Sequence, residues 1–66
     1  MKWDDTEEIV ALLEEFFPEQ DIFALRFTEL REMVMSLPGF DADDDGCNES
    51  VLEAIQMGWY SEREEK

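Results

Sequence analysis

The segment that decides the fold is residues 48–59, with the sequence NESVLEAIQMGW. Asn48 is a favoured N-cap residue, because its short side chain can accept a hydrogen bond from a free backbone N–H of the first helical turn. Glu49 follows it and suits the positive end of the helix dipole. Apolar residues then recur with the helical period, at Val51, Leu52, Ile55 and Trp59. The segment therefore predicts an amphipathic helix, and we expect the polar tail 61–66 to fray.

Two segments before it carry the same period. Residues 6–17 start after Asp5, which can act as an N-cap with Glu8 three residues later, and they end at Pro18. Residues 29–37 start after Thr28 and stop at Pro38-Gly39. The first stripe is Ile9, Leu12, Leu13, Phe16 and Phe17, and the second is Leu30, Met33, Val34 and Leu37. Both segments are predicted to be helices.

The remaining apolar residues complete the expected fold. Residues 25–27 alternate in polarity and are predicted to form a short strand that pairs with residues 2–4. Trp3 and Trp59 are expected to be core anchors. A chain of 66 residues has room for one domain, which we place at residues 1–66. The predicted fold class is mainly α, a small three-helix domain with minimal short β-strands.

The composition excludes several function classes. Nineteen acidic residues against five basic ones give a net charge of −14, which repels nucleic acid and anionic lipid and favours a soluble monomer. The chain would instead attract a basic protein surface or metal cations. Arg26 and Arg31 are expected to form ion pairs that relieve local repulsion.

Cysteine and histidine usage narrows the chemistry further. Cys47 is the one cysteine and there is no histidine, so an intrachain disulfide, a structural zinc site and a Cys–His catalytic pair are all unexpected. The N-terminus lacks the apolar region of a signal peptide, and the longest apolar run is far too short for a membrane span. We therefore expect a cytoplasmic protein that is not an enzyme and does not associate with a membrane.

An acidic loop, residues 41–49 with the sequence DADDDGCNE, lies between the second and third predicted helices. In the register of an EF-hand, Asp41, Asp43 and Asp45 take positions 1, 3 and 5, but position 12 is Leu52 where a bidentate glutamate is needed. Three interpretations stay open: a partial calcium site, a shallow site for Fe(II), Mg²⁺ or Mn²⁺, or a solvated loop. The candidate metal ligands are Asp41, Asp43, Asp44, Asp45, Glu49 and Glu53.

The same carboxylates are candidates for partner binding. A broad acidic face explains why so many acidic residues occur outside the loop as well as within it. Met57 and Tyr60 fall off the apolar stripe of the third predicted helix and, if exposed, would be contact residues. The candidate partner-binding residues are Asp41, Asp43, Asp44, Asp45, Glu49, Glu53, Met57 and Tyr60.

Several strings at this spacing resemble the IscX family of iron-sulphur cluster assembly proteins. They are Trp3-Asp4-Asp5, residues 18–21 (PEQD), residues 26–30 (RFTEL), and residues 48–56 (NESVLEAIQ) with Trp59. Ile22 stands where the family often has proline, and Gly46 lies in a loop that often carries proline. Both departures concern loops.

The resemblance implies a small winged-helix-like fold and a role as an adaptor of the cysteine desulfurase, a pyridoxal-phosphate enzyme that supplies sulfur. It also implies weak Fe(II) binding through surface carboxylates and iron-dependent modulation of cluster assembly, with a docking area that overlaps that of frataxin. Our hypothesis is that the acidic face docks on a basic patch of the desulfurase and that Fe(II) changes the charge of this face. Two alternatives from other classes stay open, namely a calcium-responsive module and an acidic mimic of nucleic acid.

Overall fold

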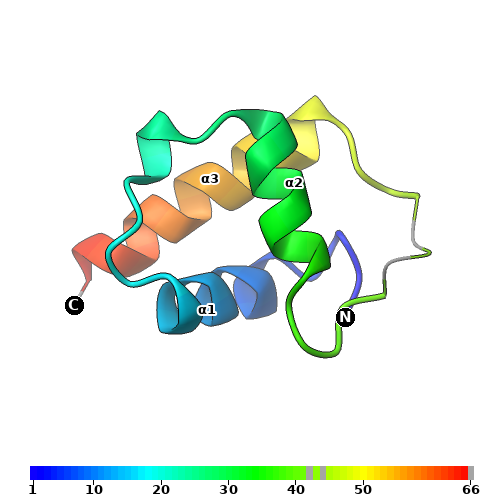
Figure 1. Cartoon of the computed structure of the whole chain (residues 1–66), viewed down its shortest axis with the longest axis horizontal. Helices are drawn as coiled ribbons and strands as arrows, with labels where there is room; N and C mark the ends of the chain where they lie inside the picture. Colours follow the sequence, from blue (N-terminus) through cyan, green and yellow to red (C-terminus); the bar gives the residue numbers. More distant parts are fainter. Residues whose placement is uncertain (42, 44, 66) are drawn as a thin grey trace.

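The computed structural model describes residues 1–41, 43 and 45–65, and within them it is built from helices. Helix α1 spans Thr6–Phe16, the short 3₁₀ helix η1 spans Ile22–Ala24, α2 spans Phe27–Met35, and α3 spans Glu49–Glu64. Helices α1 and α3 form the principal packed pair, and α2 crosses one side of it (Figure 1). The loop between α2 and α3 lies at one end of the molecule, and the C-terminus lies at the other end (Figure 1).

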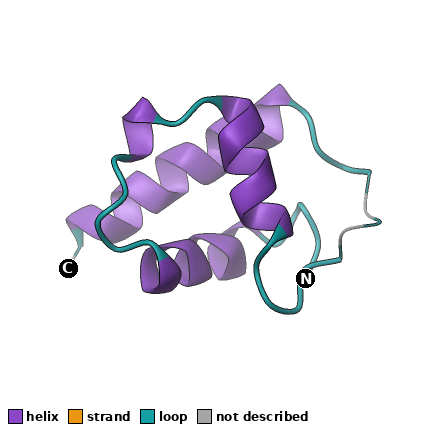
Figure 2. Cartoon of the chain, in the orientation of Figure 1, coloured by secondary structure: helices purple, strands orange, loops and turns teal. Residues whose placement is uncertain are grey.

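The described residues contain three α-helices and no β-strand (Figure 2). The prediction of a winged-helix-like domain with short strands is therefore wrong in its strands, although the chain is mainly helical. Residues 22–24 close into a 3₁₀ turn and α2 already begins at Phe27, so too little extended chain remains at 25–27 to form a strand. The N-terminus pairs elsewhere: the Asp41 N–H donates to the Met1 carbonyl at 2.7 Å, and the Met1 amino group donates to the Gly39 carbonyl at 3.1 Å.

The helix starts follow the sequence to different degrees. The start of α3 is as predicted, because Asn48 Oδ1 accepts a hydrogen bond from the Val51 N–H at 3.0 Å. Asp5 is the N-cap residue of α1, as predicted, but its carboxylate accepts from the Lys2 N–H at 2.8 Å and makes no side-chain hydrogen bond to the first turn. Helix α2 starts before Thr28, and the Glu29 carboxylate instead accepts from the Arg26 N–H at 3.3 Å.

The core lies between the three helices and the N-terminal segment. Trp3 and Trp59 are both buried, as predicted. Phe16 was expected in the stripe of α1 but is 51% exposed, and Val10 is buried instead. The buried apolar residues are Trp3, Ile9, Val10, Leu13, Ile22, Leu30, Val34, Leu37, Leu52, Ile55 and Trp59.

Glycine makes the close approach of α1 and α3 possible. A Cβ added at Gly58 would lie 3.2 Å from Val10 Cγ1, which is tighter than an ordinary van der Waals contact. The missing side chain at Gly58 therefore lets the two helices pack closely.

The C-terminal tail continues as helix through Glu64, and the fraying expected for residues 61–66 stays a prediction. Arg63 Nε lies 2.9 Å from Glu14 Oε1, and Arg63 Nη2 donates to the Phe17 carbonyl at 2.9 Å. Arg63 Nη1 donates to the Gln20 carbonyl as well. One arginine therefore ties the last turn of α3 to the end of α1 and the turn that follows it.

Candidate functional site

The acidic loop is fixed at both of its ends. Before it, the Phe40 ring packs edge-on against Trp3 with ring centroids 4.9 Å apart, and Gly39 adopts the left-handed backbone conformation (φ +81°) that glycine favours. Near its C-terminal end, Cys47 is half-buried against the core and Asn48 caps α3. The apolar anchors on either side hold the carboxylates out into solvent.

The predicted acidic site residues lie at the surface wherever they are described. Asp41, Asp43, Asp45, Glu49 and Glu53 are all exposed, whereas Asp44 lies outside the described residues. Asp41 Oδ1 accepts a hydrogen bond from the Asp43 N–H at 3.0 Å, a local turn that aspartate favours.

No group of three or more Asp, Glu or Cys side chains in the described part of the chain lies close enough together to hold a metal ion. Exposed carboxylates are hard oxygen donors that suit a hydrated divalent cation. The described geometry fits an ion held by one or two carboxylates that keeps much of its water, and it does not fit a preformed cage. The predicted metal ligands stay a prediction.

One exposed stripe of α3 continues from the loop to the far end of the helix. Residues three or four positions apart share a helix face, which places Glu49, Glu53, Met57, Tyr60 and Glu64 along one line. All five are exposed. We call this line the α3 stripe. It carries acidic residues at its N-terminal end and apolar side chains toward its C-terminal end.

Sequence reasoning missed one residue of this surface, Phe23. The Phe23 ring lies 4.9 Å from the Tyr60 ring, centroid to centroid, at a tilt of 55°. Phe23 belongs to η1. Ile22, the residue before Phe23, is buried, and the short 3₁₀ turn then directs Phe23 outward.

Tyr60 has a raised pKa because of its neighbour Glu64. The Tyr60 hydroxyl donates a hydrogen bond to the Glu64 carboxylate, and this bond, together with the negative charge of Glu64, raises the pKa of Tyr60 above its ordinary value near 10. The phenol is neutral at physiological pH with or without this shift, so its ring presents an uncharged surface.

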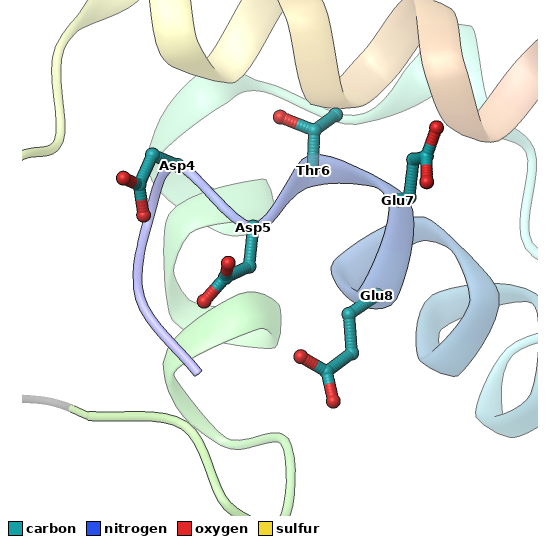
Figure 3. Close-up of a pocket in the computed structure, with 5 residues that line it drawn as sticks. All are labelled: Asp4, Asp5, Thr6, Glu7 and Glu8. Atoms are coloured by element: carbon teal, nitrogen blue, oxygen red, sulfur yellow. The ribbon is translucent and has the colours of Figure 1, made fainter.

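A second acidic surface lies at the start of α1. Asp4, Asp5, Thr6, Glu7 and Glu8 line an open hollow of about 390 Å³ (Figure 3). The carboxylates of Asp5 and Glu8 point to one side of the chain, and that of Glu7 points to the other (Figure 3). The side chains do not converge, so the hollow adds negative charge to the surface without forming a chelating site.

Arg26 and Arg31 form no ion pair with any residue that the structure describes, so this expectation is wrong. The ion pair present among these residues is Arg63–Glu14. No helix that the structure describes has both the length and the apolar character that a bilayer span requires.

The comparison with known families decides which family the chain belongs to. The family model described as iron-sulphur cluster assembly matches residues 1–64. The chain belongs to this family. The resemblance to the IscX family, first suggested by the strings at residues 3–5, 26–30 and 48–59, is thereby confirmed.

The iron-sulphur cluster assembly family also sets the broad biological role. Membership supports a role in iron-sulphur cluster assembly. The family is not a known enzyme family. An uncharacterised protein of Pseudomonas aeruginosa is 44% identical over 64 residues, which cover 97% of each chain. No solved structure gives a significant match.

Proposed function

We propose that this protein is an acidic adaptor that binds the cysteine desulfurase of iron-sulphur cluster assembly and modulates the rate of cluster formation. The observation that carries the proposal is the position of the acidic loop and the α3 stripe, which present five exposed carboxylates from residue 41 to residue 53 in a chain of this family. A surface of one charge sign favours fast, oriented association with a surface of the opposite sign. The partner surface would therefore be rich in arginine and lysine.

Weak binding of Fe(II) is the second part of the proposal. The ions would be held at Asp41, Asp43, Asp44, Asp45, Glu49 or Glu53 by one or two carboxylates each, with low affinity. Each bound Fe(II) would reduce the negative charge of the docking face and so weaken its attraction to a basic partner. Iron would in this way tune the competition between this adaptor and other acidic partners. We further propose that the protein acts as a monomer in the cytoplasm.

The calcium-responsive alternative is disfavoured by the position of Leu52. This residue would occupy position 12 of an EF-hand, but its side chain is buried in the core. Titration with Ca²⁺ tests the point, since saturation below micromolar concentration with a rearrangement of the helices would support the calcium module over the adaptor. The nucleic-acid mimic makes a different prediction, namely capture of a nucleic-acid-binding protein from a lysate in place of the desulfurase.

The proposal is tested by measuring binding to immobilised desulfurase at several salt concentrations. The double variant Asp43→Asn, Asp45→Asn should lower the association rate constant by about tenfold at low salt, and the difference should shrink as salt screens the charges.

The double variant Glu15→Gln, Glu19→Gln is the matched control. It makes the same change in net charge, from −14 to −12, with two exposed residues at the end of α1 and in the segment after it. Figure 1 shows this segment at the opposite end of the molecule from the loop between α2 and α3. It should change the rate by less than about twofold, because local charge pairs dominate steering. Absence of desulfurase binding, or binding that is independent of salt, would refute the adaptor proposal.

A further inference from the structure

The α3 stripe carries apolar residues just before Glu64, and acidic docking alone does not explain them. Phe23 is 55% exposed, Met57 is 54% exposed and Tyr60 is 39% exposed. Scattered surface apolar residues are ordinary, but here the Phe23 and Tyr60 rings are in contact, and Met57 lies one helical turn before Tyr60 on the same face. We call Phe23, Met57 and Tyr60 the aromatic patch.

The aromatic patch is built on fixed elements. Ile22, beside Phe23, is buried in the core, and its carbonyl accepts a hydrogen bond from Gln56 Nε2 of α3 at 3.4 Å. The turn that carries Phe23 is closed by the Leu25 N–H, which donates to the Ile22 carbonyl at 3.4 Å. Because η1 is thus attached to α3, the two rings are held in place before a partner arrives, and little conformational entropy remains to be lost on binding.

The charges around the patch indicate the chemistry of its occupant. Glu53 and Glu64 lie on the same stripe of α3, and Asp21, which precedes η1, is also exposed. Two basic residues lie three positions from the patch in sequence: Arg63 is directed toward Glu14, and Arg26 is exposed. Two copies of this surface would bring their acidic rims together and repel each other. The arrangement complements an apolar hollow framed by arginine and lysine.

We propose that the aromatic patch is the anchor by which the docked protein stays on the desulfurase, inserted into an apolar hollow within the basic surface of that enzyme. This inference rests on the proposed function and adds Phe23 to the interface. It assigns different tasks to the two ends of the α3 stripe. The acidic end accelerates association, whereas the aromatic end slows dissociation, because desolvated aromatic anchors carry most of the binding energy of an interface.

The test compares two phenylalanines of similar exposure. Phe23→Ser removes a ring of the patch, while Phe16→Ser removes the ring of the last residue of α1. Figure 1 shows this end of α1 apart from η1. With immobilised desulfurase, Phe23→Ser and Tyr60→Ser should raise the dissociation rate constant by at least about tenfold, as expected for anchor residues, with the association rate constant and its salt dependence unchanged. Phe16→Ser should dissociate at the wild-type rate. Tyr60→Phe should also do so, because it keeps the ring.

The outcomes separate this inference from the function on which it rests. If wild-type binding is salt-dependent but Phe23→Ser dissociates at the wild-type rate while remaining folded by circular dichroism, the aromatic anchor is refuted and the acidic adaptor stands. If the wild-type protein does not bind the desulfurase, the aromatic anchor and the acidic adaptor are both refuted. If sedimentation reveals a wild-type dimer that Phe23→Ser dissolves, the occupant is a second copy, and the anchor proposal is overturned.

Discussion

Replacing Arg63 with methionine should remove a large part of the stability of this protein, although the residue lies three positions from the C-terminus. Arg63 Nε is 2.9 Å from Glu14 Oε1, and its guanidinium also donates to two backbone carbonyls at the end of α1 and in the turn after it. The guanidinium carbon further lies 5.4 Å from the centre of the Trp59 ring. Methionine keeps much of the aliphatic length and removes all of these polar contacts.

The size of the effect follows from the burial of Glu14. Its side chain is only 6% exposed, against 28% for Arg63, so the substitution leaves a buried carboxylate without this cation. Removing one member of a buried ion pair costs about 3–5 kcal/mol. Trp59 Nε1 still donates to Glu14 Oε1 at 3.0 Å and water can reach the vacated position, so we expect about 2–4 kcal/mol here. A domain of 66 residues has a total stability of about 3–10 kcal/mol, so this loss is substantial.

Urea denaturation followed by circular dichroism measures the loss. Urea is preferable to guanidinium chloride, because the latter is a salt and would screen the net charge of −14. With a slope near about 1 kcal/mol per M, the midpoint should fall by about 2–4 M. Arg31→Met is the matched control, because it removes the same charge from an exposed residue of α2, and it should cost less than about 0.5 kcal/mol.

A second substitution identifies the source of the cost. Glu14→Gln in the Arg63→Met background keeps a carbonyl oxygen for the Trp59 N–H but removes the buried charge, so it should restore at least about 1 kcal/mol. If Arg63→Met is no less stable than Arg31→Met, the reasoning from the buried ion pair is wrong. If Glu14→Gln restores nothing, the cost comes from the lost carbonyl contacts and not from the charge.

Three further outcomes test separate parts of the structure. Gly58→Ala should lower the free energy of unfolding by up to about 2 kcal/mol, because crowding against Val10 Cγ1 outweighs the gain of about 1 kcal/mol in helix propensity. A Gly58→Ala variant more stable than the wild type would refute the close packing. Asn48→Ala should lower the free energy of unfolding, measured by heat or urea, by about 1 kcal/mol. Asn48→Ser should lower it much less, because serine can still cap α3, and equal losses for the two variants would exclude the cap. Tyr60 is the one tyrosine, so tyrosinate absorbance should report a pKa above about 10 that falls in Glu64→Gln, and an unchanged titration would contradict the hydrogen bond to Glu64. Because this folded-state pKa is raised, the stabilisation from Tyr60 is present below about pH 10 and is lost as pH rises through the folded pKa.

Features fixed by residues close together in the sequence could be predicted, whereas features that depend on distant residues could not. The start of α3 was predicted because Asn48 and the residues that follow it contain the whole cap within a few positions. The start of α2 was missed, since Thr28 and Arg26 are both compatible with a helix start and the choice depends on the turn at Ile22–Ala24. The strand at residues 25–27 was predicted from alternation over three residues, a pattern too short to distinguish a strand from a connector.

The candidate site divides in the same way. The exposure of Asp41, Asp43 and Asp45 follows from charge density, because the burial of so many carboxylates would be prohibitive. Met57 and Tyr60 were placed outside the apolar stripe by helical period alone, and both are exposed. Phe23 was missed because its neighbour across the patch, Tyr60, is far away in the sequence, so their contact arises only in the folded chain.

The sequence by itself determined the three amphipathic segments, the acidic loop and the family, because periodicity, caps and charge are properties of neighbouring residues. The tertiary structure decided where the N-terminal segment pairs, how Arg63 holds the end of α3, and which apolar side chains remain outside the core. Those outcomes depend on contacts between residues far apart in the chain, such as Arg63 with Glu14 and Phe23 with Tyr60, whose energies exist only once the helices have packed.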